Sequence, residues 1–312
     1  MENLQVATNA VIPFMVYILM GIIAKRYGAV KEAFLKELNG VIFRVFFPFI
    51  MFNNLYDVDF STLKGTSYVP FAFIVTLIVI FAAFFVVPVL EKENPRRGVI
   101  IQAIFRSNSV LFAIPLTERV FGAEGVVMAS ILVAFVVPLY NVASVAILEY
   151  YKGGEVNLAT LIKNILKNPL IIGAIAGVIF NLLPITMPVS LVDPIAELSA
   201  LATPMALFVL GGTLHFSDIR KNALPLFIGT LSKLILIPAA VVSLMAAFKF
   251  EPAQLFVVFC MFATPVAAAS YPMAQSMGGD ADLAGEYVVI STLFSIVTIF
   301  LWILILKNMG LI

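Results

Sequence analysis

Long apolar runs, separated by short stretches that hold charges, glycine or proline, form the pattern of this chain. Each run has about 20 residues, the length that a helix needs to cross the hydrocarbon core of a bilayer. The pattern predicts an all-α membrane protein with ten transmembrane helices. Their predicted limits are 5–25, 36–55, 68–90, 98–119, 124–149, 169–186, 196–214, 223–248, 254–277 and 284–306.

The fourth predicted span is interrupted by four consecutive polar residues, 106–109, which cannot all face lipid. Serine and asparagine favour helix N-caps. Pro115 removes a backbone donor and disfavours helical geometry at Ile114. These residues predict two half-helices, and a simple proline kink is the alternative.

The ninth predicted span repeats this arrangement. Thr264-Pro265 aligns with Ser107-Asn108, and Ser270, Tyr271 and Pro272 align with Ala113, Ile114 and Pro115. We therefore predict helix breaks at Pro115, Pro265 and Pro272. Interrupted helices at matching places in two halves of a chain are typical of a transport site near mid-membrane.

The matching places belong to a duplicated half. A shift of 156 residues aligns Pro13 with Pro169, Gly21 with Gly177, Pro48 with Pro204 and Phe52 with Phe208, and a shift of 157 aligns Phe105 with Phe262 and Gly122 with Gly279. Because five spans per half is an odd number, the second half enters the membrane from the opposite side. We predict a first inverted repeat over 1–150, a short cytoplasmic connection over 151–168 and a second repeat over 169–312.

Lysine and arginine are distributed unevenly between the predicted connections. One alternate set holds Lys25, Arg26, Lys31, Lys36, Lys92, Arg96, Arg97, Lys152, Lys163, Lys167, Arg220 and Lys221, and the other holds Lys64, Arg119, Lys249 and Lys307. Cytoplasmic connections carry the excess of basic residues. We therefore predict a multi-pass protein of the cell membrane with both termini outside the cytoplasm.

Composition indicates the same class of protein. With 62% hydrophobic and 12% charged residues, the chain has too little polar surface for a soluble fold of 312 residues. A net charge of +1 without a basic patch argues against a nucleic-acid partner. The single Cys260 has no second cysteine to pair with, so we interpret it as a packing residue. No cofactor is expected, and the apolar run 6–24 is interpreted as a retained span and not as a secretory signal.

An enzyme is not expected. The alternative is an intramembrane aspartyl protease, whose catalytic loop the segment Met277-Gly278-Gly279-Asp280 resembles superficially. Met277 stands where the first glycine is required, and no second buried aspartate is predicted to face Asp280.

The predicted binding site lies where the two interrupted spans cross. A half-helix N-terminus offers unpaired N–H groups and positive dipole charge, which favour a carboxylate ligand. The expected substrate is therefore a small organic anion. The substrate-binding candidates are Asn108, Ser107, Ser109, Arg106, Ser270, Tyr271, Gln275 and Asn53.

Several of these candidates also have a structural interpretation. Asn108 could form only an interhelical hydrogen bond, and Arg106 could cap a neighbouring helix or reach the cytoplasmic surface. Asn53 could cap a helix, and Gln275 could pack in the core.

Other polar residues are weaker candidates. Glu118 would suit proton coupling if it were buried, but its place near a span end favours a solvated residue. The embedded cations Arg44 and Lys233 are interpreted as structural, and His215 as an interface residue.

Four segments resemble the auxin efflux carrier family, which includes malate and malonate permeases and the PIN-type auxin exporters. They are LNGVIFRVFFPFIMF, FRSNSVLFAIPL, NPLIIGAIAGVIFNLLP and LATPMALFVLGGTL. The resemblance implies a five-plus-five inverted-repeat carrier, similar to the bile acid sodium symporters. Spans one, two, six and seven would form a scaffold. The other spans would form a mobile transport domain in which the fourth and ninth cross.

The resemblance also implies a role for Asn108, which matches the crossover asparagine that contacts substrate in PIN-type carriers. Ser107 stands where those carriers have a proline, and their long central loop is missing here. Both departures favour a microbial organic-acid carrier over an auxin exporter.

The predicted function is secondary transport of a mono- or dicarboxylate, such as malate or malonate, by alternating access. Transport would be proton-linked or facilitated, and the alternatives are a sodium-coupled carrier or an exporter of indole acids. A receptor or a passive channel would not explain matched helix breaks. The expected partners are the anion, a proton or sodium co-ion, the lipid bilayer and a second copy of the chain.

Overall fold

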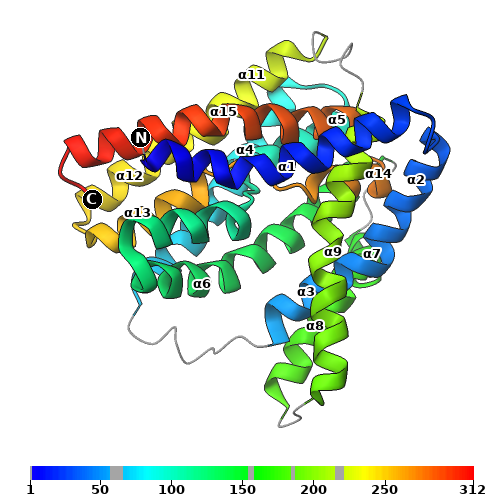
Figure 1. Cartoon of the computed structure of the whole chain (residues 1–312), viewed down its shortest axis with the longest axis horizontal. Helices are drawn as coiled ribbons and strands as arrows, with labels where there is room; N and C mark the ends of the chain where they lie inside the picture. The colour runs from blue at the N-terminus through cyan, green and yellow to red at the C-terminus, as the bar shows by residue number, and fades with distance from the viewer. Residues whose placement is uncertain (1, 57–65, 154–157, 184–186, 215–220) are drawn as a thin grey trace.

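The computed structural model describes residues 2–56, 66–153, 158–183, 187–214 and 221–312. This part of the chain is helical apart from short connections and one isolated β-bridge. The helices are α1 (Glu2–Arg26), α2 (Glu32–Val41), η1 (Ile42–Phe46), α3 (Phe47–Tyr56), α4 (Tyr68–Leu90), α5 (Asn94–Phe105), α6 (Ser109–Tyr151), α7 (Leu158–Leu166), α8 (Pro169–Leu182), α9 (Val189–Thr213), α11 (Ala223–Leu231), η3 (Ser232–Leu236), α12 (Ile237–Ala247), α13 (Pro252–Ala263), α14 (Ser270–Met277) and α15 (Ala281–Asn308). Figure 1 shows α3, α8 and α9 together at one end of the molecule, and α12 and α13 at the other.

The predicted all-helical membrane protein is confirmed. In the described residues, six helices are long and apolar enough to cross a membrane, and the bent pair α7 and α8 would add a seventh. Two further predicted spans are shorter because they are interrupted: α5 precedes one break, and α13 precedes the other. Helix α6 joins parts of two predicted spans across a kink at Gly122, whose φ of 62° suits a residue without a Cβ atom.

Local sequence signals account for several helix ends. The Asn168 side chain accepts a hydrogen bond from the Leu170 N–H at 3.0 Å and so caps α8, which begins with proline. The Asp280 side chain caps α15 in the same way through the Leu283 N–H. Gly278, with a φ of 80°, ends α14 in the left-handed conformation.

The predicted connection 151–168 contains a short helix, α7, which is bent by 66° from α8. The nine-residue helix is too short to stand out from a polar connection by its sequence pattern. The neighbouring limits also move, since α8 ends at Leu182 and α9 begins at Val189, directly after Pro188.

Two helix pairs pack with almost no space between their backbones. A Cβ atom on Gly21 of α1 would lie 1.9 Å from the Phe208 carbonyl oxygen of α9. A Cβ atom on Gly173 of α8 would lie 2.3 Å from the Pro48 carbonyl oxygen of α3. Only glycine fits such contacts, so α1 with α9 and α3 with α8 are held in fixed register.

The centre of the molecule is formed around α13. Its residues from Leu255 to Ala263 are all buried, whatever face of the helix they lie on. By contrast, α4 leaves large apolar side chains such as Ile78, Phe81 and Phe85 exposed. An exposed apolar helix surface of this kind is suited to contact with lipid.

Candidate functional site

The two interrupted spans meet at their breaks. Ser107, between α5 and α6, forms an antiparallel bridge with Val266, between α13 and α14. The Asn108 N–H donates to the Pro265 carbonyl at 2.8 Å, and the Ala267 N–H donates to the carbonyl of residue 106 at 3.3 Å. Two of the backbone N–H groups released by the breaks are therefore satisfied by the opposite break, as the interior of a membrane requires.

The sequence explains where each helix stops. Arg106 adopts an extended conformation, with φ of −83° and ψ of 112°, at the first of the four polar residues. Thr264 is also extended, with φ of −77° and ψ of 155°, because the following Pro265 disfavours helical geometry at the residue before it.

Two predicted helix breaks need correction. Pro265 lies within a break, but Pro115 and Pro272 lie inside α6 and α14. The helix resumes at Ser109, six residues before Pro115. Pro272 occupies the first turn of α14, where a proline does not remove any intrahelical hydrogen bond.

A cavity of about 720 Å³ opens beside the meeting point of the breaks. Its lining comes from α1, α3, α8 and α9 on one side, and from α6 and the two breaks on the other. The polar lining residues are Tyr17, Asn54, Arg106, Ser107, Asn108, Ser109, Tyr140, Asn141, Ser199 and Thr203. No aspartate, glutamate or histidine is among the described residues that line it.

Arg106 is the charged group of the cavity lining. The residue is 4% exposed, and its guanidinium donates to the Asn141 Oδ1 at 2.5 Å and to the Met273 sulfur. Within the described residues, no carboxylate lies at ion-pair distance from Arg106. A buried guanidinium held only by neutral groups is an uncompensated positive charge.

A second buried cation lies next to the cavity lining. Lys233, in the π-helical segment η3, is fully buried and donates to the Ser107 hydroxyl. Lys233 was interpreted as structural, and it forms no ion pair with a carboxylate of the described residues. Arg44, the other embedded cation of the sequence, is exposed in η1.

Asn108 occupies the N-cap position of α6, but its side chain does not cap the helix. The residue is 9% exposed and lines the cavity, and its Nδ2 atom has no hydrogen-bond partner in the described structure. The neighbouring Ser109 also lines the cavity, with its hydroxyl unpartnered. Both side chains therefore retain hydrogen-bonding capacity that a ligand could use.

The candidates from the second break lie elsewhere. Ser270, Tyr271 and Gln275 do not line the cavity, where this break contributes Ala267, Ala268 and Ala269 instead. The Tyr271 hydroxyl is 2.5 Å from the Thr213 Oγ1 of α9 and accepts from the Gln275 Nε2 at 3.3 Å. The Tyr271 hydroxyl therefore joins α14 to α9, and the second break leaves the cavity lining to small side chains.

Two further candidates are not part of the cavity. Asn53 is half-buried, and the neighbouring Asn54 lines the cavity in its place. Glu118 is exposed four residues before the kink at Gly122, which agrees with a residue at a span end. His215 lies outside the described residues.

Sequence reasoning missed Asn141, Tyr140 and Thr203. They lie in the long helices α6 and α9, where one or two polar residues among apolar neighbours change the local hydropathy pattern little. A polar residue buried in a membrane helix is a functional candidate by default. Asn141 could have been identified on that ground, because it lies within a predicted span.

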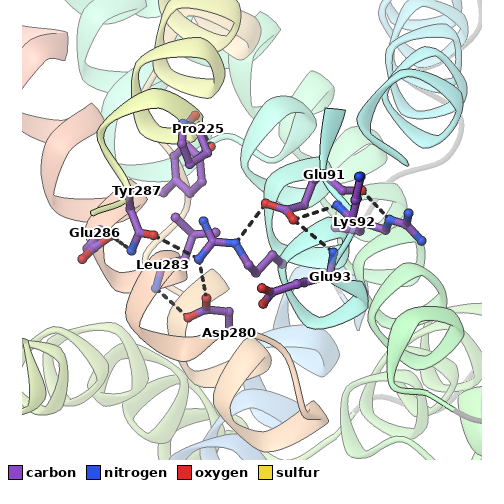
Figure 2. A network of polar contacts seen from close by, with 11 residues as sticks. Glu91, Lys92, Glu93, Pro225, Asp280, Leu283, Glu286 and Tyr287 are labelled. Atoms are coloured by element: carbon purple, nitrogen blue, oxygen red, sulfur yellow. Dashed lines mark hydrogen bonds and ion pairs between the residues drawn. The ribbon is translucent and has the colours of Figure 1, made fainter. Parts of the chain in front are cut away.

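A polar cluster joins the two interrupted spans at one end (Figure 2). Arg96, in the first turns of α5, pairs with Glu91 at 2.9 Å and with Asp280 at 3.3 Å, and the Asp280 N–H donates to the Pro95 carbonyl. Burial raises the pKa of the Glu91 carboxyl, but the Glu93 N–H, Arg96 and the Lys92 N–H lower it more, so the pKa lies below its usual range. The two broken spans therefore contact each other at two places: at their breaks and through this polar cluster.

The chain is similar to known membrane transport proteins. The chain matches the family described as Membrane transport protein over residues 6–159 and 154–303. It is 24% identical to an uncharacterized transporter from Methanothermobacter thermautotrophicus over 302 residues, 96% of this chain and 98% of that protein. It is 20% identical to an uncharacterized transporter from Methanocaldococcus jannaschii over 314 residues, 97% of this chain and 100% of that protein.

Proposed function

Because the chain belongs to the membrane transport protein family, which includes the auxin efflux carriers, we propose that it carries a small organic anion by alternating access. The observation that carries this proposal is the Arg106 guanidinium, which lines the central cavity without a carboxylate partner among the described residues. A carboxylate substrate would supply the missing negative charge.

An anionic ligand would compensate the buried charge of Arg106. Burying a guanidinium is costly unless it is paired, and the low dielectric of the site strengthens its attraction for an anion. The cavity lining adds amide and hydroxyl groups and no acidic residue, so nothing on the described wall competes for the cation.

The proposed architecture has ten spans in two inverted repeats. Helices α1, α2, α3, α8 and α9 form the scaffold, which the glycine contacts described above keep rigid. The remaining spans form the transport domain, and both termini lie outside the cytoplasm. The substrate site lies between the two domains, since the cavity lining comes from both.

The cavity and α14 lie on opposite sides of the breaks in this architecture. The cavity lining of α6 begins at Ser109 and follows the first break, toward the outer surface in the proposed topology. On the inner side, α14 contacts the scaffold: Tyr271 bonds to Thr213, and the Asn39 Nδ2 donates to the Pro272 carbonyl at 3.4 Å. The described conformation is then open outward, and transport requires α14 to separate from the scaffold.

The residues that line the cavity also bear on the driving force for transport. The described lining has no group that titrates near neutral pH and no acidic residue to hold a cation. Facilitated flux or flux driven by the membrane potential is therefore the mode favoured for malate, malonate or a monocarboxylate. An uptake rate that depends on the imposed pH gradient or sodium gradient would identify the co-ion.

Purified protein in liposomes tests the proposal. We expect saturable uptake of at least one of labelled malate, malonate, lactate and indole acetate, measured under imposed pH, sodium and potassium-diffusion gradients. Asn108→Ala should abolish this uptake, because it removes the amide at the crossing, whereas Asn53→Ala should retain it. Unsaturable conductance without exchange would indicate a channel, and unchanged uptake by Asn108→Ala would refute the site.

A further inference from the structure

We propose that Asn141 positions Arg106 and completes a hydrogen-bond-donor site that accepts an ionised carboxylate and rejects the corresponding amide. This inference rests on the proposed anion transport and concerns the chemistry of recognition. Asn141 lies in α6, well beyond the kink at Gly122, and is 2% exposed. Together with Arg106 and Asn108 it lines the central cavity.

The hydrogen bond to Arg106 fixes how Asn141 is oriented. Its Oδ1 accepts from the guanidinium Nη2 at 2.5 Å, so the carbonyl end of the amide faces Arg106. An arginine has only donors, which means that the opposite orientation of the amide would place donor against donor. The Nδ2 group must then point away from Arg106, and it has no partner in the described structure.

The same side of the cavity holds further donors without acceptors. Asn108 also has an unpartnered Nδ2, and Arg106 retains the donors that neither Asn141 nor Met273 uses. Arg106, Asn108 and Asn141 all line the cavity, and each carries N–H donors that no acceptor of the described residues uses.

Such a site separates ligands by their hydrogen-bonding groups more than by their size. An ionised carboxylate only accepts hydrogen bonds, and its two oxygens can satisfy several donors at once. An amide of the same shape brings an NH₂ group against the protein donors and leaves buried groups unpaired. We expect the carboxylate to bind about tenfold or more tightly than its amide.

The alternative role for Asn141 is purely structural, as an anchor for Arg106. Asn141→Asp keeps an acceptor for the guanidinium, removes the NH₂ group and adds a negative charge that compensates Arg106. If Arg106 and Asn141 were only a structural pair without contact to substrate, the aspartate would serve as well. On our proposal the variant folds, since the added charge is paired with Arg106, and loses anion uptake.

The test is competition against labelled substrate uptake in liposomes, with three pairs of competitors: lactate and lactamide, malonate and malonamide, indole acetate and indole acetamide. We expect the wild type to prefer each acid that it binds over its amide. In Asn141→Ala the KM for the acid should rise about tenfold and the acid-to-amide preference should shrink. Asn141→Asp should lose uptake, with a thermal unfolding temperature in detergent at or above that of the wild type.

Ser144→Ala is the matched control, because Ser144 is fully buried one turn along α6 and does not line the cavity.

The outcomes distinguish the two levels of the argument. Absence of saturable uptake of any carboxylate by the wild type overturns the proposed function and this assignment with it. Wild-type uptake that Asn141→Ala or Asn141→Asp leaves unchanged, in KM and in acid-to-amide preference, overturns the role of Asn141 alone. A loss of uptake in Ser144→Ala equal to that in Asn141→Ala would also overturn it, because the effect would then be one of packing.

Discussion

The two helix breaks both begin with an extended residue and pair with each other, but they differ in chemistry. The first break brings a guanidinium, a hydroxyl and an amide to the cavity through Arg106, Ser107 and Asn108. The second break brings Ala267, Ala268 and Ala269, and its larger polar residue Tyr271 faces the neighbouring helix α9 instead. The difference teaches that duplicated positions can keep a shared backbone role while only one copy carries the binding groups.

The largest expected effect comes from the charge of the first break. Arg106→Gln should weaken substrate binding by roughly 30-fold or more, since removing one partner of a buried, hydrogen-bonded charge pair costs about 2 kcal/mol or more. The measurement is the concentration dependence of uptake in liposomes. Arg44→Gln is the control, because Arg44 is an exposed arginine within a predicted span and lies outside the cavity. Equal losses in both variants would contradict the assignment.

The second break should act through its backbone. Pro265→Ala relaxes the restraint that keeps Thr264 extended, and so weakens the bond from the Asn108 N–H to the carbonyl of residue 265. We expect a loss of about 1 kcal/mol of stability, seen as a fall of roughly 2–4 °C in the unfolding temperature, and about fivefold slower uptake with little change in KM. Pro88→Ala, within α4, serves as the control. A large change in KM would mean that the second break also binds substrate.

Tyr271 should affect the access equilibrium and leave affinity unchanged. Tyr271→Phe removes the hydrogen bond to Thr213 and should shift the equilibrium by about fivefold toward the conformation in which α14 is released. Maleimide labelling of Ser199→Cys, a cavity residue, in a Cys260→Ser background reports the shift as slower labelling from outside. Tyr287→Phe is the matched control, since it also loses one tyrosine hydrogen bond, which goes to the Pro225 carbonyl and not to α9.

The smallest effect concerns the cluster that ties the two broken spans at their ends. The Glu91 pKa is lower in the folded protein than its ordinary value of 4.5, so the carboxylate stabilises the fold fully above that value. The contribution is lost as the pH falls through the lowered pKa. We expect a small drop in unfolding temperature in detergent between about pH 5 and pH 3 that is weaker in Glu91→Gln. An unaltered pH profile in the variant would show that the cluster does not stabilise the folded state.

The sequence predicted the parts of this molecule that depend on neighbouring residues. Four polar residues in succession stop a membrane helix wherever they occur, and Pro265 acts on Thr264 directly before it. The positions of Pro115 and Pro272 were predicted wrongly as breaks, because a membrane helix accepts proline when its released carbonyl finds another partner or when the proline lies in the first turn.

The parts that were not predicted depend on residues far apart in the chain. Arg106 and Asn141 are separated by 35 positions, and Tyr271 and Thr213 by 58. A single sequence indicates that such side chains are buried in membrane helices but not which of them face one another. For the same reason, the alignment of the two halves made substrate-binding candidates of Ser270, Tyr271 and Gln275. These residues lie outside the lining of the described cavity.

The unpaired Arg106 guanidinium also has an electrical consequence for the proposed transport cycle. Arginine keeps its proton at physiological pH, so a cavity without substrate carries one positive charge at this residue, and a bound monovalent anion cancels it. Moving one elementary charge through a potential of 100 mV involves about 2.3 kcal/mol. If the site moves through the field, the empty carrier therefore experiences the voltage more strongly than the loaded carrier does. The return step then becomes the voltage-sensitive step, and cells could regulate flux through their resting potential without any further binding site.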